Sequence, residues 1–190
     1  MRYLALLRGI NVGTSGRIRM DALKHLLEDA GFSDVVTYIQ SGNVLFQSDL
    51  AEDAARDAIE RALKDGASIT TTAVLRSSDA LAQLIRSCPF SPDEIARAQA
   101  QNTEGESFYV CLLPQEPDEK TLDTLRSVES GADAFRVCNR EIYLLLQQSI
   151  RNSKLAIRLQ RLVPSMTVRN WNTMEQLYAL AFPSINTNGG

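Results

Sequence analysis

The sequence of 190 residues predicts an α+β protein built from two similar halves. Hydrophobic residues make up 44% of the chain and charged residues 23%, which is typical of a folded protein and excludes wholesale disorder. Segments with alternating apolar residues follow segments with helical periodicity along the chain. The same order of elements recurs after roughly 100 residues, which is the spacing of a small domain rather than of a solenoid repeat.

The first half has the order β-α-β-β-α-β-α. Its pattern predicts strands at residues 2–8, 35–39, 44–46 and 69–75, and helices at 20–30, 51–64 and 78–88. The first helix ends where Gly31 suits the position after a helix C-cap. Ser41-Gly42 predicts a two-residue hairpin turn between the second and third strands.

The second half repeats this order after a polar segment. Residues 89–106 predict a linker with at most one short helix, at 93–98. Strands are then expected at 108–113, 135–138, 142–146 and 166–168, and helices at 118–130, 151–163 and 172–182. The expected division is a half at 1–88, the linker, a second half at 107–185 and a loose tail at 186–190.

A β-α-β-β-α-β unit is the ferredoxin-like arrangement, in which right-handed crossovers give the strand order 4-1-3-2. This order brings the loop after the first strand and the hairpin between strands two and three to one end of the sheet. The first strand of each half is apolar on both faces, which predicts cover on both faces. An RNA-binding sheet with an open aromatic face is therefore disfavoured.

Charge and cysteine usage limit the class of protein. The net charge of −3 excludes a generally basic, nucleic-acid-coating protein. Three cysteines without a C-x-x-C pair, no signal-peptide pattern and no long apolar run predict a cytoplasmic protein. A single histidine, His25, and acidic pairs confined to helix ends predict neither a metal site nor a histidine-based catalytic triad.

The glycine-bearing loop after the first strand is the first candidate site. Its glycines permit backbone conformations that turn N–H groups toward a common point, and Arg8 adds positive charge. The residues expected to hold a phosphate or carboxylate are Arg8, Gly9, Asn11, Gly13, Gln40, Ser41 and Asn43. The glycine spacing matches neither the dinucleotide nor the P-loop pattern, so no cofactor is predicted. The alternative is that Arg8 and Asn43 only join the two loops.

A basic stripe on the predicted helix at 151–163 is the second candidate. Arg151, Lys154, Arg158 and Arg161 fall on one side of this helix, and residues 136–169 hold seven Lys/Arg against one acidic residue. Such a stripe indicates a nucleic-acid or acidic-protein partner. The alternative is an ordinary solvated helix face.

Arg169 and Asn170 form the third candidate, as a second anion site or a tie between the halves. They precede Trp171, which is expected to be an apolar plug. Asn172, followed three residues later by Glu175, resembles a helix N-cap with its capping-box partner.

Several sequence motifs, taken together, distinguish this chain from other α+β proteins. They are RGINVG at 8–13, TYIQSGNVLF at 37–46, TVRNWNTM at 167–174, Met20 with Gly31-Phe32, and Pro89-Phe90. Over residues 2 to about 182 the chain thereby resembles the family catalogued as domain of unknown function 1697. The resemblance implies a bacterial soluble protein of two α+β halves and carries no known activity. Thr14 stands where the family usually has a second glycine, which is expected to stiffen the loop.

Three functional hypotheses follow. The leading one is a protein that binds a small phosphate- or carboxylate-bearing ligand at the loop and hairpin. The second is an interaction module that uses the basic stripe on nucleic acid or an acidic protein. The third is an enzyme that works at the same loop without histidine, through Arg/Asn electrostatics, although no nucleophile or base stands out.

Overall fold

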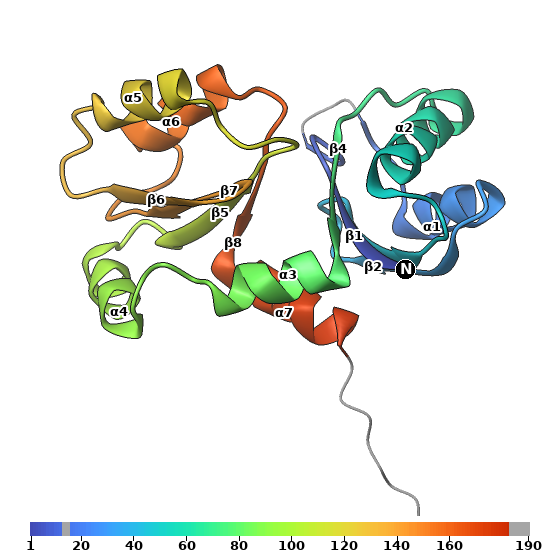
Figure 1. The fold of residues 1–190 in the computed structure, drawn as a ribbon, viewed down its shortest axis with the longest axis horizontal. Coiled ribbons are helices and arrows are strands. Elements are labelled where there is room, and N and C mark those ends of the chain that lie inside the picture. Colours follow the sequence, from blue (N-terminus) through green and yellow to red (C-terminus); the bar gives the residue numbers. More distant parts are fainter. Residues whose placement is uncertain (13–15, 183–190) are drawn as a thin grey trace, which may run out of the picture. The chain divides into compact units, whose positions relative to one another are not determined.

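The computed structural model describes residues 1–12 and 16–182, which are drawn in Figure 1. The chain divides into two compact units. The first comprises Met1–Ile85 with the chain from Met174 onward, and the second comprises Arg86–Thr173. Residues 174–182 thus belong with the first unit, whereas the division predicted from the sequence groups them with the second half.

The first unit contains a four-stranded sheet, and two of its helices cover one face of that sheet (Figure 1). Its elements in chain order are β1 (Arg2–Leu7), α1 (Met20–Asp29), β2 (Ser33–Tyr38), β3 (Asn43–Gln47), α2 (Glu52–Ala67), β4 (Ala73–Ser77) and α3 (Ser78–Arg86). The strand order is β2-β3-β1-β4, and all neighbouring strands are antiparallel. This order confirms the predicted 4-1-3-2 arrangement.

The first core lies between this sheet and the helices α1 and α2. It contains alternate residues of β1 with the apolar stripes of both helices, among them Tyr3, Ala5, Leu7, Leu23, Leu27, Ile59 and Leu63. The opposite face of β1 is buried as well, because Leu4 and Leu6 are both 0% exposed. Burial on both faces confirms what the continuous apolar run of this strand predicts.

The end of α2 and the start of β4 differ most from the predicted boundaries in the first unit. Helix α2 continues to Ala67, and Ser68 ends it with a positive φ of 55°. The following strand therefore begins only at Ala73, while Ile69 packs into the core ahead of it. The apolar run at 69–75 marks burial correctly, but its first part is a buried connection rather than a strand.

The second unit repeats the sheet. Its elements are α4 (Pro92–Gln101), β5 (Phe108–Leu112), α5 (Glu119–Arg126), β6 (Ala134–Cys138), β7 (Glu141–Leu145), α6 (Lys154–Leu162), β8 (Thr167–Asn170) and the start of α7 (Trp171–Ala181). The strand order is β6-β7-β5-β8. Helices α5 and α6 lie on one face of this sheet (Figure 1). The core on that face includes Cys111, Leu125, Ile142, Leu144 and Leu159.

The segment predicted as a linker contains the full helix α4. Ser91 and Glu94 form a capping box, in which each side chain accepts a hydrogen bond from the other residue's backbone N–H, and Pro92 lies in the first turn. Arg136 of β6 holds this end of α4, because its guanidinium binds the Glu94 carboxylate at 2.7 Å and lies over the Phe90 ring at 4.3 Å. The Arg136 bond holds the pKa of Glu94 at about 2.

The two sheets repeat at the level of individual pairs. In the first sheet Leu4 of β1 pairs with Arg76 of β4, and in the second Val110 of β5 pairs with Arg169 of β8. Each arginine donates from Nη1 to the carbonyl oxygen of the residue before it, at 2.7 Å for Arg76 and 2.8 Å for Arg169. The duplication predicted from the order of elements thus extends to strand register.

None of the helices in the described ranges is both long and apolar enough to cross a membrane.

Candidate functional site

The loop after β1 and the β2–β3 hairpin meet at one end of the first sheet, as the predicted topology requires. Leu7 N–H donates to the Gly42 carbonyl at 2.8 Å, and the Asn11 side-chain Nδ2 donates to the Gln40 carbonyl at 3.0 Å. The two segments are 29 residues apart in sequence. The predicted neighbourhood of these two segments is therefore confirmed.

Asn11 is the centre of the loop's hydrogen bonding. Besides Gln40, its Nδ2 donates to the Ile18 carbonyl at 3.0 Å, and its Oδ1 accepts from Ile18 N–H at 2.9 Å. Its backbone N–H donates to the Gly16 carbonyl at 2.9 Å, and it adopts a positive φ of 57°. Because both amide hydrogens and the amide oxygen bind the backbone, Asn11 connects Ile18, on the far side of the loop, with Gln40 of the hairpin.

Two glycines permit the close approach of these segments. Gly42 has φ of 73°, and a Cβ there would lie 3.0 Å from the Cβ atoms of Leu7 and Ile10. Gly16 has φ of 67°, and its Cβ would lie 2.9 Å from the Gly9 carbonyl oxygen. Both positions therefore disfavour a side chain, by conformation and by space. Gly13, also predicted for the site, lies outside the described residues.

Asn43 and Ser41 are occupied within the hairpin turn. Asn43 is 0% exposed, and its Nδ2 donates to the Tyr38 carbonyl at 3.1 Å and to Ser41 Oγ at 2.9 Å. A buried amide needs such partners, since leaving it unsatisfied would cost about 1–3 kcal/mol. Both of these bonds lie within the hairpin, and neither reaches the loop after β1.

Arg8 and Gln40 differ from the other predicted residues. Both are exposed, and neither side chain forms a hydrogen bond or ion pair with any residue that the structure describes. The Arg8 backbone is nevertheless fixed on both sides, because its N–H donates to the Thr72 carbonyl at 3.0 Å and its carbonyl accepts from Thr71 Oγ1 at 2.7 Å. A guanidinium and a carboxamide thus extend from a rigid base toward solvent.

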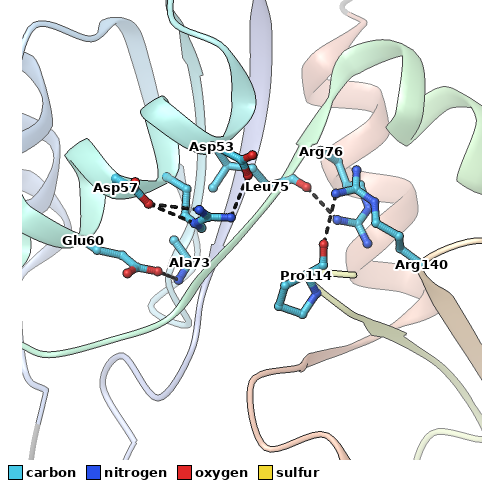
Figure 2. Close-up of polar contacts among 9 residues, drawn as sticks. Asp53, Asp57, Glu60, Ala73, Leu75, Arg76, Pro114 and Arg140 are labelled. Atoms are coloured by element: carbon cyan, nitrogen blue, oxygen red, sulfur yellow. Dashed lines mark hydrogen bonds and ion pairs between the residues drawn. The ribbon is translucent and has the colours of Figure 1, made fainter. Parts of the chain in front are cut away.

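An open groove of about 290 Å³ lies beside this end of the sheet. Residues of α2 and of the segment before β4 line it, namely Glu60, Arg61, Lys64, Asp65, Thr70 and Thr71. Glu60 Oε1 accepts from Ala73 N–H at 2.9 Å, a contact visible in Figure 2. Two cations and two carboxylates give this lining no net charge. Sequence patterning misses the groove because these residues look like an ordinary exposed helix face followed by a loop.

A neighbouring network stiffens α2. Arg56 donates to Asp53 at 2.8 Å and to Asp57 at 3.1 Å, and both carboxylates are shown in Figure 2. The two acidic partners raise the pKa of Arg56 against the opposing effect of burial. Because Arg56, Asp53 and Asp57 bind one another, we do not assign them a ligand.

In the second unit, Arg169 and Asn170 have local partners. Arg169 Nη1 donates to Thr167 Oγ1 at 2.7 Å, and desolvation of the guanidinium lowers the pKa of Arg169 to about 10. Asn170 Oδ1 accepts from Thr173 N–H at 2.9 Å. It is therefore Asn170 that caps α7, and the prediction of Asn172 as the N-cap is wrong. Asn172 instead binds the Glu106 carboxylate at 3.2 Å.

Trp171 is an apolar contact of the second unit, as expected. Its ring stacks on Phe108 with centroids 4.8 Å apart and lies 6.3 Å from the Tyr143 ring. Such aromatic pairs contribute about 0.5–1.5 kcal/mol beyond the area they bury. Trp171 is thus a packing residue rather than a stacking platform for a base.

The basic stripe is present on α6 and the turn before it. Arg151, Lys154, Arg158 and Arg161 are all exposed, and their side chains form no ion pair or hydrogen bond within ranges 1–12 and 16–182. The helix has no acidic residue in its sequence. Its opposite face is buried through Leu155, Ala156 and Leu159. The structure thereby separates these four cations from Arg136, Arg140 and Arg169, which bind other groups of the protein.

Cys111 is fully buried, and desolvation raises the pKa of its thiol well above the usual range. Within the described ranges, no group of three or more His, Cys, Asp or Glu residues could hold a metal ion.

Sequence comparison places the chain in a family. Residues 1–143 match the family described as "Protein of unknown function (DUF1697)". The chain belongs to the DUF1697 family. This match ends before β8 and α7, whereas the resemblance in the motifs extends to residue 182. No curated protein matches the chain.

The DUF1697 chain also resembles a solved structure. This is the conserved bacterial protein SP0830 from Streptococcus pneumoniae, with 22% identity and a TM-score of 0.75. The likeness covers 95% of this chain and 97% of that protein. At this identity the likeness concerns the fold, and it supports the architecture of both halves of this DUF1697 protein.

Proposed function

We propose that this protein binds a small phosphate- or carboxylate-bearing ligand at the end of the first sheet, through Arg8 and Gln40. The observation that carries this proposal is the exposed Arg8 guanidinium, which has no acidic partner among the described residues although its backbone is fixed by Thr71 and Thr72. A guanidinium presents a planar fork of donors that matches carboxylate and phosphate oxygens.

The described part of the loop supports this role because hydrogen bonds within the protein hold it in place. Asn11 satisfies the loop's own backbone and joins it to the hairpin at Gln40. A preformed site loses little conformational entropy when a ligand binds. The Gln40 carboxamide adds a donor that remains able to bind a ligand.

Thermal unfolding in phosphate and in acetate, against chloride at equal ionic strength, tests the proposal. A ligand at ten times its Kd adds about 1.4 kcal/mol to the free energy of unfolding. We expect either anion to raise the Tm of the native protein and of Arg86→Ala, a control at an exposed arginine of α3 that has no ion pair with a described residue. Arg8→Ala should lose the shift. An equal shift in Arg8→Ala, or no shift in the native protein, would overturn the proposal.

A second candidate function is supported by Arg151, Lys154, Arg158 and Arg161, the four cations of α6 and the turn before it that have no acidic partner among the described residues. Since one face of α6 is buried and the other carries only cations among its charged groups, it suits the phosphate backbone of a nucleic acid. Four phosphate contacts with a single strand would give a slope of log K against log salt of about −3. Arg158→Glu with Arg161→Glu should abolish binding of a dT20 oligonucleotide. The charge-matched control Lys24→Glu with Arg97→Glu should retain it, and equal loss in both would contradict this role.

A further inference from the structure

Two large apolar side chains are exposed at the proposed anion site. Val12 is 67% exposed and Ile39 is 51% exposed. Val12 directly follows Asn11 and Ile39 directly precedes Gln40, so the two residues flank the hydrogen bond that joins the loop to the hairpin. The polar groups of the site therefore have apolar neighbours that the fold leaves in contact with water.

Ile39 is also held in an unfavourable backbone conformation. Its φ is +48°, in the left-handed region where a β-branched side chain crowds the backbone. Glycine or asparagine would adopt this conformation more easily. The hairpin imposes it, because Tyr38 pairs with Asn43 and the Asn43 amide binds the Tyr38 carbonyl across the turn. The Ile39 backbone is therefore strained, and because the side chain is half exposed, its burial does not offset this strain.

Strain of this kind persists where the surrounding structure imposes it, and it is concentrated at functional sites such as ligand clamps. The positive charge of Arg8 at the same site limits which ligands could contact Ile39. The Arg8 guanidinium favours an anionic group. Covering Val12 and Ile39 with apolar surface would remove them from water and strengthen binding, whereas hydroxyl groups would not have this effect. A sugar phosphate would satisfy the arginine alone.

We infer that the ligand is an amphipathic anion, an aryl or alkyl phosphate or carboxylate whose apolar body covers Ile39 and Val12 while its anionic group binds Arg8. This inference rests on the proposed function and names the class of its ligand. It also gives Ile39 a role in specificity, since the apolar contact distinguishes such a ligand from inorganic phosphate and from sugar phosphates.

Calorimetric titration with three phosphates tests the inference. Phenyl phosphate, glycerol phosphate and inorganic phosphate share the head group and differ in the body. We expect phenyl phosphate to bind about tenfold more tightly than the other two, the change given by removing roughly 55 Å² of apolar surface from water. Equal affinity of the native protein for all three would overturn the inference and leave the anion site intact.

The variant Ile39→Gly distinguishes the effect of backbone strain on stability from the effect of the Ile39 side chain on ligand preference. Glycine relieves the positive φ, so this variant should raise the Tm while it removes the preference for phenyl phosphate and leaves inorganic phosphate binding unchanged. Ser68→Gly is the matched control, because Ser68 has φ of +55° at the end of α2. It should also raise the Tm but keep the tenfold preference. A preference retained in Ile39→Gly would overturn the inference.

Two further readouts distinguish the remaining outcomes. Arg8→Ala should lose all three phosphates, and failure of the native protein to bind any of them would overturn the proposed anion site itself. Sedimentation of the free protein tests whether a second copy covers the apolar pair. A dimer that Ile39→Gly or Val12→Ser dissociates would assign these side chains to self-association and overturn their role in ligand binding.

Discussion

The side-chain nitrogen of Asn11 donates a hydrogen bond to the carbonyl oxygen of Gln40 at 3.0 Å. This bond connects the loop after β1 to the turn of the β2–β3 hairpin. It fixes the proposed ligand-binding groups relative to one another, because Arg8 lies in the first segment and Gln40 in the second. Rigid placement of this kind is what a selective anion site requires.

Removing the Asn11 side chain should destabilise the protein. Asn11→Gly retains the positive φ and deletes three side-chain hydrogen bonds, so we expect a loss of about 1–3 kcal/mol. Gln40→Ala should change stability by less than about 0.5 kcal/mol, because Gln40 accepts through its backbone carbonyl. Urea unfolding of both variants checks this difference. Equal stability of the two variants would show that the Asn11 amide is not the tie between the segments.

Adding a methyl group at Gly42 should be more costly than adding one at Gly31. Both glycines have positive φ, at 73° and 93°, so alanine strains both. Only at Gly42 would the new Cβ meet Leu7 and Ile10 at 3.0 Å, whereas nothing lies within 4 Å at Gly31. We expect Gly42→Ala to lose about 1–3 kcal/mol more than Gly31→Ala. Chemical denaturation measures the difference, and equal losses would contradict the close packing of loop and hairpin.

The Arg136–Glu94 ion pair should make stability depend on acid pH. The folded pKa of Glu94 is about 2 against an ordinary value of 4.5, so the unfolded chain takes up the proton first. The stabilising contribution is therefore complete above about pH 5 and is lost as pH falls from 4.5 toward 2.

Glu94→Gln tests this pH dependence. The variant should be less stable than the native protein at pH 7, and the difference should shrink as the pH approaches 2. Glu116→Gln is a suitable control, since Glu116 is exposed and its side chain forms no hydrogen bond or ion pair with a described residue. A Glu94→Gln difference that stays constant from pH 7 to pH 2 would show that the pair does not lower this pKa.

Cys111 should resist alkylation in the folded protein. Its thiol is fully buried, and the raised pKa keeps the nucleophilic thiolate scarce. Cys88 and Cys138 are partly exposed and should react with iodoacetamide under native conditions. Intact mass and peptide mapping should find both of these adducts and an unmodified Cys111, with three adducts after denaturation. Native modification of Cys111 as fast as Cys138 would contradict its burial.

The architecture could be predicted because it depends on patterns that the whole chain repeats. Leu23 and Leu27 follow helical spacing and are both buried, and the turn predicted at Ser41-Gly42 lies between the observed β2 and β3. Local capping was harder to predict. Asn172 fits a capping-box spacing, but Asn170, two residues earlier, binds Thr173 N–H and starts the helix. Where two asparagines lie in one short segment, tertiary contacts decide which of them caps the helix.

The candidate site could be predicted only in part. Topology places Arg8, Asn11, Gln40 and Asn43 together, and the structure confirms the meeting of their segments. Whether a side-chain amide stabilises the fold depends on which backbone carbonyl groups lie near it. Sequence spacing does not predict the positions of these carbonyl groups. The left-handed conformation of Ile39 is contrary to its intrinsic preference, so only the folded hairpin reveals it.

Nuclear magnetic resonance titration of the ¹⁵N-labelled protein with phenyl phosphate is the most direct test of the anion site at Arg8. We predict that the largest amide shifts fall at Arg8, Gly9 and Gln40, that they saturate, and that they vanish in Arg8→Ala. Shifts confined to residues 151–161, or none at concentrations up to tens of millimolar, would contradict a specific anion site at the end of the first sheet.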